Sequence, residues 1–256
     1  MTGWIAITRQ VSPSINQCEL THLERQPIDV QRAQSQHREY ERALRSLGTE
    51  VISLPPAADL PDSVFVEDAA IVLDECAVMT RPGADSRKPE VDFIADTLEK
   101  YRKLYFIQPP GTLDGGDVLT VGKSVYVGIS SRSNKPAIEQ LQVFLEPLGY
   151  SVRGVTVSGC LHLKSAVTQV GENLLLVNPA WVSKDVFPRM DFIDVDSAES
   201  YAANAVLVDG QVIYPAAFPL TGRRLKDAGI KLTLVDASEL AKAEGAVTCC
   251  SILFKK

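Results

Sequence analysis

Apolar residues follow two different spacings along the chain, and their succession predicts repeated helix–strand units. Tyr40, Leu44 and Leu47 fall on one face of a helix, and Gly48 is placed to end it. The apolar run at 50–54 then has the length of a strand. The same order recurs with helical faces at 93–101, 138–148 and 220–227, followed by strands at 103–107, 151–157 and 230–235. We therefore predict the α/β class.

A polar side chain precedes each of five short hairpins, and we expect it at the tip of a strand. The five are Asp68, Asp114, His162, Asn204 and Cys249, spaced roughly 45 residues apart, a period typical of propellers and other arrays. One repeat cannot cover both faces of its small sheet, so the copies must pack side by side. This pattern predicts one domain over residues 1–256, with the polar tips at the centre of a closed ring.

Composition narrows the classes of partner. The 256 residues carry a net charge of −6, and their isoelectric point is near 5.2. A general nucleic-acid or acidic-membrane binder needs a basic field, so neither partner is expected. No window has the roughly 18 apolar residues of a membrane span, and the N-terminus lacks the regions of a signal peptide. We expect a soluble, cytoplasmic protein.

The cysteines indicate free thiols. Five is an odd number, and two of them are adjacent, which suits neither a disulfide framework nor structural zinc spacing. Cys249 and His162 together are the minimum for nucleophilic catalysis, because a thiolate attacks while an imidazole moves protons. The carboxylates of Glu67, Asp68 and Asp114 suit a planar cation such as guanidinium, which carboxylates accept through paired hydrogen bonds.

Each of these residues also has an ordinary explanation when taken singly. His162 lies between two leucines, where a hydrogen-bonded core histidine is common. Gly115 and Gly116 are typical of a tight turn, adjacent cysteines are more often core than nucleophile, and the arginines 81, 87 and 132 are most simply surface charge. Their shared position in a repeat favours one common site over five separate explanations.

Several motifs, taken together, resemble those of one enzyme family. They are Phe-Val-Glu-Asp at 65–68, Thr-Leu-Asp-Gly-Gly-Asp-Val at 112–118, Leu-His-Leu-Lys-Ser at 161–165 and Thr-Cys-Cys-Ser at 248–251, and the stretch 81–87 also fits. In this order the chain resembles the dimethylarginine dimethylaminohydrolases of the guanidino-group-modifying (pentein) superfamily. The resemblance implies a five-bladed α/β-propeller of ββαβ repeats around a central channel. It also implies hydrolysis of Nω-methylated arginine to citrulline and a methylamine, without metal or organic cofactor.

The resemblance further implies catalytic roles for three residues. Cys249 would form a covalent S-alkylthiouronium intermediate, and His162 would protonate the leaving amine and then activate water. Asp114 would act beside them and help to hold the guanidinium. Cys250 is expected to be dispensable for turnover.

Substrate binding is implied for five more residues. Asp68 would hold the guanidinium, with Glu67 in support. Arg87 and Arg132 would bind the substrate's α-carboxylate, and Asp62 its α-ammonium. A lid is expected within residues 3–30, where the stretch 14–20 departs from the family's pattern.

Two alternatives remain open from the sequence. One is an arginine deiminase or another guanidine or amidine hydrolase of the same fold, although deiminases usually carry extra helical sequence. The other is a non-catalytic propeller scaffold, which has no reason to keep thiol, imidazole and acidic tips together. In each enzyme case the partner is a small guanidino compound, and the chain is expected to be a monomer or homodimer. Zinc held by Cys249 and His162 would be adventitious.

Overall fold

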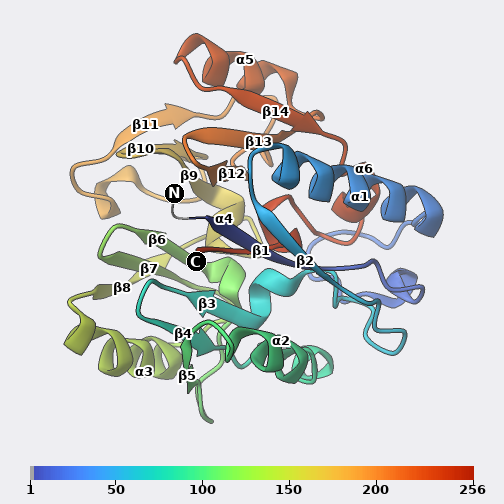
Figure 1. Ribbon diagram of the computed structural model, residues 1–256. Coiled ribbons are helices and arrows are strands. Elements are labelled where there is room, and N and C mark those ends of the chain that lie inside the picture. Colours follow the sequence, from blue (N-terminus) through green and yellow to red (C-terminus); the bar gives the residue numbers. More distant parts are fainter. Residues whose placement is uncertain (1–2) are drawn as a thin grey trace.

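The computed structural model describes residues 3–256, and in these residues five three-stranded sheets surround a common centre (Figure 1). Residues 1 and 2 of the predicted domain lie outside the described residues. In each sheet the middle strand pairs antiparallel with one neighbour and parallel with the other. The predicted α/β-propeller of ββαβ repeats is thus confirmed.

Four of the sheets are each built from three strands that are consecutive in the chain. The first sheet instead joins strands from the two ends of the chain. The strands are β15 (Ile252–Lys255), β1 (Trp4–Arg9) and β2 (Glu50–Leu54) in the first sheet; β3 (Ala70–Val72), β4 (Cys76–Met79) and β5 (Lys103–Phe106) in the second; β6 (Val118–Val121), β7 (Ser124–Ile129) and β8 (Ser151–Thr156) in the third; β9 (Val167–Gly171), β10 (Leu174–Val177) and β11 (Asp191–Asp194) in the fourth; β12 (Val206–Val208), β13 (Gln211–Pro215) and β14 (Leu232–Val235) in the fifth.

Helices α1, α2, α3 and α5 lie on the outside of the ring (Figure 1). Asp29 begins α1 by accepting a hydrogen bond from the Arg32 amide, and Gly48, with φ of 81°, follows its end. The helices are α1 (Val30–Ser46), α2 (Glu90–Leu98), α3 (Lys135–Leu145), α4 (Leu163–Ala166), α5 (Pro219–Asp227) and α6 (Ser238–Ala241), with 3₁₀ turns η1 (Ile15–Gln17), η2 (Val66–Ala69), η3 (Asp85–Arg87), η4 (Gly115–Asp117), η5 (Glu146–Leu148), η6 (Lys184–Val186) and η7 (Thr248–Cys250).

The polar tips differ in one respect from the prediction, because two of the five lie in short helical turns and two more lie immediately before one, and not in strands. Asp68 belongs to η2 and Cys249 to η7, while Asp114 immediately precedes η4 and His162 immediately precedes α4. A strand sends successive side chains to opposite faces. A helical turn can instead present neighbouring side chains and amides to the same small volume, which suits residues that meet at the centre of a ring.

Each of these turns leads directly into the innermost strand of its sheet. The inner strands pack against one another around the ring: β3 lies beside β15, and β9 lies beside both β6 and β12. Their preceding turns therefore gather at one end of the central channel.

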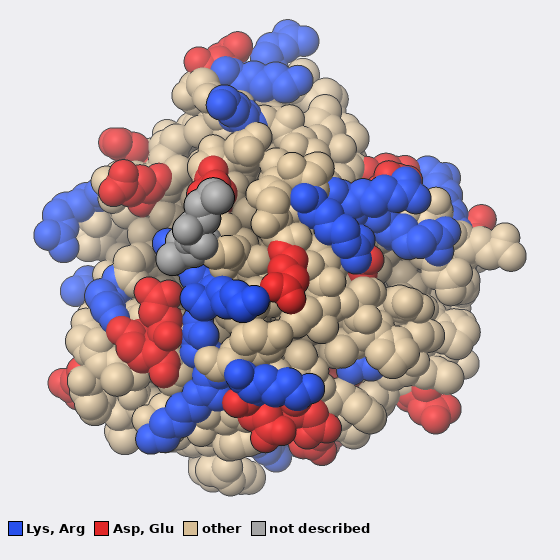
Figure 2. Space-filling model, viewed as in Figure 1, with Lys and Arg blue, Asp and Glu red and all other residues tan. Residues whose placement is uncertain are grey.

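Charged residues are spread over the outside of the ring. On the face viewed in Figure 2, positive and negative side chains are interspersed, with no continuous field of one sign. In the described part of the chain, no helix is both long and apolar enough to cross a membrane.

The inner face of α3 provides a test of the packing. Leu141 is fully buried in a cluster with residues of β4, β6 and β7, whereas Val143 of the same helix is 70% exposed. Leu141→Ala should lower the free energy of unfolding by about 2–5 kcal/mol, because it leaves a cavity. Val143→Ala should change it by no more than about 0.5 kcal/mol. Urea unfolding checks both, and equal losses would contradict this packing.

Candidate active site

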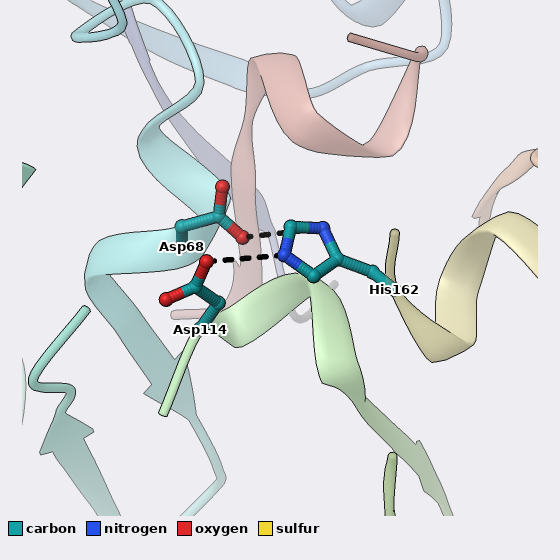
Figure 3. A group of neighbouring side chains, drawn as sticks. All are labelled: Asp68, Asp114 and His162. Carbon is teal, nitrogen blue, oxygen red and sulfur yellow. Dashed lines mark hydrogen bonds and ion pairs between the residues drawn. The ribbon is translucent and has the colours of Figure 1, made fainter. Parts of the chain in front are cut away.

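Two carboxylates, those of Asp68 and Asp114, lie next to each other against one side of the His162 imidazole (Figure 3). The His162 Nε2 atom is 3.1 Å from Asp114 Oδ2, and its Nδ1 atom is 4.0 Å from Asp68 Oδ1. The three residues come from three successive repeats and are each at most 5% exposed. This arrangement fixes the ring plane of His162 and places negative charge beside it.

The two glycines of η4 allow this close approach. A Cβ on Gly116 would collide with His162 Nδ1, and one on Gly115 would collide with the backbone carbonyl of Glu67. The Gly116 amide donates to Asp68 Oδ1 over 2.8 Å. The Gly-Gly pair is therefore required by the contact between the second, third and fourth repeats, and not only by a local turn.

Asp117, at the end of the same turn, holds the backbone beside His162. Its carboxylate is fully buried and accepts hydrogen bonds from the Leu163 amide at 3.0 Å and from the hydroxyls of Ser130 and Ser133 at 2.6 Å each. Ser133 Oγ in turn accepts from the Asp114 amide. Both residues that flank the Gly-Gly pair are thus tied to the histidine.

Arg87 is placed differently from the simplest expectation of a substrate carboxylate binder. It is 5% exposed, and its Nη1 atom donates to Asp68 Oδ2 over 2.6 Å. Its Nε and Nη2 atoms donate to Glu90, and Nη2 also donates to the Phe65 carbonyl. Most of its donors are therefore engaged by the protein, and its clearest effect is to keep Asp68 ionised and in place.

Glu67 faces away from the cavity of Asp68 and His162. Lys164 Nζ donates to its Oε1 atom over 2.5 Å, and Thr248 Oγ1 donates to its Oε2 atom over 2.8 Å. The Asn204 side chain adds two hydrogen bonds to Thr248: its Oδ1 atom accepts from the Thr248 amide, and its Nδ2 atom donates to the Thr248 hydroxyl. Glu67 lines a separate cavity of about 250 Å³ bordered by the inner strands. Together, Glu67 and Asn204 hold Thr248, the residue before Cys249, in place.

Cys249 shares one small cavity with six of the other seven predicted residues. Its lining includes Asp62, Asp68, Arg87, Asp114, Arg132 and His162, and its volume is only about 20 Å³. Cys250 points elsewhere, because it is buried in the core with its thiol directed to the Ala246 carbonyl. The cavity thus combines a thiol, an imidazole, carboxylates and a partly exposed arginine.

Electrostatics keep the thiol protonated and the imidazole charged. Burial raises the pKa of Cys249 to about 12, and the negative charges of Glu67 and Asp68 add to the effect. Burial alone would lower the pKa of His162, but the charge of Asp68 and the hydrogen bond that His162 donates to Asp114 outweigh it and raise this pKa to about 9. Burial opposes ionisation of Asp68 too, yet His162 and Arg87 lower its pKa to about 2. Near neutral pH the pair is thiol and imidazolium.

The same charges bear on metal binding. One potential ligand atom each from Asp68, Asp114 and His162 lies within 4.8 Å of the others. An imidazole coordinates a metal only without its proton. At neutral pH the raised pKa of His162 therefore disfavours a metal ion at these three residues.

Some lining residues carried no recognisable signal in the sequence. Glu19, Ala243, Glu244 and Gly245 border the cavity outside the recognised motifs, whereas Phe65 and Leu161 border it as members of the motifs at 65–68 and 161–165. Glu244 precedes the cysteine motif, but isolated surface carboxylates are common, and its neighbour in space lies more than two hundred residues away.

Comparison with known proteins places this cavity in context. A family described as "N,N dimethylarginine dimethylhydrolase, eukaryotic" matches residues 7–190. The N(G),N(G)-dimethylarginine dimethylaminohydrolase of Streptomyces coelicolor is 39% identical over 98% of this chain and 97% of its own length. The chain belongs to the dimethylarginine dimethylaminohydrolase family.

Two further similarities agree with this membership. The dimethylaminohydrolase of Pseudomonas aeruginosa is 38% identical over 88% of this chain and 90% of its own length. A solved structure of the enzyme from that organism, a cysteine-to-serine mutant complexed with citrulline, superimposes with a TM-score of 0.94. It covers 99% of this chain and 100% of the other at 36% identity. The predicted family and enzyme class are confirmed.

The charge state of Cys249 is directly testable. With a pKa near 12 the free thiol should show almost no thiolate absorbance at neutral pH, and thiolate should appear only as the pH approaches that value. A guanidinium ligand should lower this pKa, because a cation stabilises the thiolate. Ultraviolet titration of the protein, with Cys249→Ser as the blank, measures both. Thiolate that forms near neutral pH without ligand would contradict this assignment.

Proposed function

We propose that this chain hydrolyses Nω-methylated arginine to citrulline and a methylamine, with Cys249 as the nucleophile. The observation that carries the proposal is the single cavity in which Cys249 and a charged His162 meet Asp68 and Asp114. Carboxylates that surround a thiol fit a guanidinium and not an acyl group. The similar proteins described above are named for the same reaction.

Asp68 and Asp114 hold the guanidinium so that its central carbon faces the sulfur of Cys249. Asp68 is kept ionised by Arg87, and the Gly83 amide fixes Asp114 through a 2.8 Å bond to its Oδ1 atom. The substrate cation then stabilises the thiolate that the buried carboxylates otherwise disfavour. The enzyme's own thiol therefore becomes reactive only when the substrate is present.

The reaction proceeds in two halves that share His162. The Cys249 thiol loses its proton to solvent as the guanidinium binds, the thiolate attacks the guanidinium carbon, and protonated His162 gives its own proton to the methylamine as the C–N bond breaks. The product of this half is the S-alkylthiouronium adduct. Neutral His162 then takes a proton from water, which attacks the same carbon, and the C–S bond breaks to leave citrulline and the thiolate.

The amino-acid end of the substrate is bound by Arg132 and Asp62. Arg132 is partly exposed and supplies a cation for the α-carboxylate, while Asp62 is 5% exposed and supplies a carboxylate for the α-ammonium. Arg87 contributes mainly through Asp68, given its bonds to Asp68 and Glu90. Glu67 supports the site through Thr248 and its charge near Cys249. No organic cofactor is needed for these steps. The proposal also includes a cytoplasmic location and a monomeric or homodimeric state.

The function is tested by the products. The protein is incubated in parallel with asymmetric dimethylarginine, monomethylarginine and arginine, and citrulline is quantified. We expect citrulline from the methylated substrates, with loss of more than about a thousandfold in Cys249→Ser because no covalent route remains. Cys250→Ala, the matched control, should retain activity. Citrulline mainly from arginine would move the assignment to a deiminase.

The role of Asp114 is tested by the pH dependence. Its hydrogen bond raises the pKa of His162, so Asp114→Asn should lower that pKa and shift the basic limb of the kcat profile to lower pH. At a mildly basic pH we expect kcat to fall by roughly 10- to 100-fold. Asp92→Asn, at an exposed position on α2, serves as the control. An unshifted profile would show that Asp114 does not act through His162.

A further inference from the structure

Residues 18–25, here called the covering loop, lie against the active cavity. The loop is closed at its base, where the Asn16 side chain exchanges two hydrogen bonds with the backbone of Ile28. Arg25 braces it from within through the carbonyls of Asn16 and Cys18, at 2.6 Å each. The loop is thus a preformed unit whose tip can be held or released as a whole.

The tip is held by polar groups from the cavity wall. The Glu19 amide donates to Asp62 Oδ2 over 3.1 Å, and Arg132 Nη2 donates to Thr21 Oγ1 over 2.9 Å. Ser86 Oγ adds a bond of 2.6 Å to Glu19 Oε1. Two of these three partners are the residues that bind the amino-acid end of the substrate in the proposed function.

Glu244 makes the densest contact with the tip. Its carboxylate accepts hydrogen bonds from three consecutive backbone amides, those of Thr21 at 3.0 Å, His22 at 2.5 Å and Leu23 at 2.6 Å. Successive amides that converge on one anion form a strong, charge-assisted site. Glu244 reaches them from a left-handed backbone conformation, with φ of 58°, which a residue other than glycine seldom adopts.

Apolar packing holds the first part of the covering loop, where Cys18 is buried and Leu20 packs against the core, but it contributes little at residues 21–23. Leu23 is 39% exposed, and with His22 it borders a second, largely apolar cavity of about 330 Å³. That cavity shares Leu161, Glu244 and Gly245 with the active cavity. Residues 21–23 therefore rest on polar bonds beside open space, and not on a packed core, so they can move at modest cost.

The size of the active cavity requires such a movement. Its volume of about 20 Å³ accommodates a water molecule but not a methylated arginine. His162, Asp68 and Asp114 beside it are buried and Cys249 is partly buried, whereas most of the covering loop is exposed. Substrate entry therefore requires the tip to leave the cavity wall.

We propose that Glu244 is a positioning residue that latches the covering loop over the active cavity. When substrate occupies Asp62 and Arg132, the loop loses those two contacts. Glu244 and the bond between Ser86 and Glu19 then hold the closed loop. The latch consequently matters more for the substrate complex than for the free protein. This last step rests on the proposed roles of Asp62 and Arg132, while the latch itself does not.

Two graded variants test the latch. Glu244→Gln keeps the side-chain length but loses the charge and one acceptor oxygen. Glu244→Asn tolerates the left-handed backbone, but its amide oxygen is one methylene short of the three N–H groups. Glu24→Gln changes an exposed carboxylate on the covering loop itself and is the control.

The first readouts need no turnover. Hydrogen exchange at the amides of Thr21, His22 and Leu23 should be faster in both variants, and most in Glu244→Asn. Alkylation of Cys249 by a small neutral reagent should accelerate by roughly 3- to 10-fold, corresponding to the loss of charge-assisted bonds. A gating effect multiplies the alkylation rate equally at every pH, whereas a changed thiol pKa would shift its pH dependence.

Steady-state kinetics then test the effect on the substrate complex. KM for methylated arginine should rise roughly tenfold in Glu244→Asn, with kcat lowered by less than about threefold. Unchanged amide exchange, or faster exchange without faster alkylation, would overturn the latch. Faster exchange and alkylation with wild-type KM would overturn its role in holding the substrate. Failure of the proposed reaction would appear separately, as absence of citrulline from the wild-type protein.

Discussion

The burial of several carboxylates at the centre of a ring is the constraint on which the rest of the site depends. A buried charge is costly unless it is paired or hydrogen-bonded. Asp68 meets this requirement through Arg87 and the Gly116 amide, Asp117 through the Leu163 amide and two serines, and Glu67 through Lys164 and Thr248. Because Gly116, Leu163, Lys164 and Thr248 belong to other repeats than the carboxylates they bind, these bonds also hold repeats in register.

The same charges decide the resting state of the chemistry. Carboxylates near Cys249 oppose a thiolate, and carboxylates near His162 favour an imidazolium, so the two groups do not form a preactivated pair. In the proposed reaction a guanidinium offsets the carboxylates and permits the thiolate at the same time. Selection for a cation and activation of the nucleophile then have one physical cause. A neutral substrate would meet an unreactive thiol.

The sequence predicted the ring and its central residues because both depend on periodic patterns. Spacing of Asp68, Asp114, His162 and Cys249 indicated that they meet, and the resemblance supplied the family. The helical turns at the tips were not predicted. His162, for example, stands between Leu161 and Leu163, and this alternation of apolar and polar residues is compatible with a strand. Glu67 turns away from the cavity because Lys164 and Thr248 hold it, and no spacing encodes that choice. Glu244 escaped notice because its partners are backbone amides, which have no sequence signature.

The closure of the ring brings Cys249 close to the covering loop. Strand β15 begins three residues after Cys249 and pairs antiparallel with β1, and the chain that leaves β1 continues into η1 and the covering loop. The thiol and the loop are therefore carried by adjacent strands of one sheet, although they lie at opposite ends of the sequence. Glu244, on the segment that leads to Cys249, bonds to the loop across this junction. Closing the propeller with both chain ends thus brings Cys249, Glu244 and the covering loop together at one place.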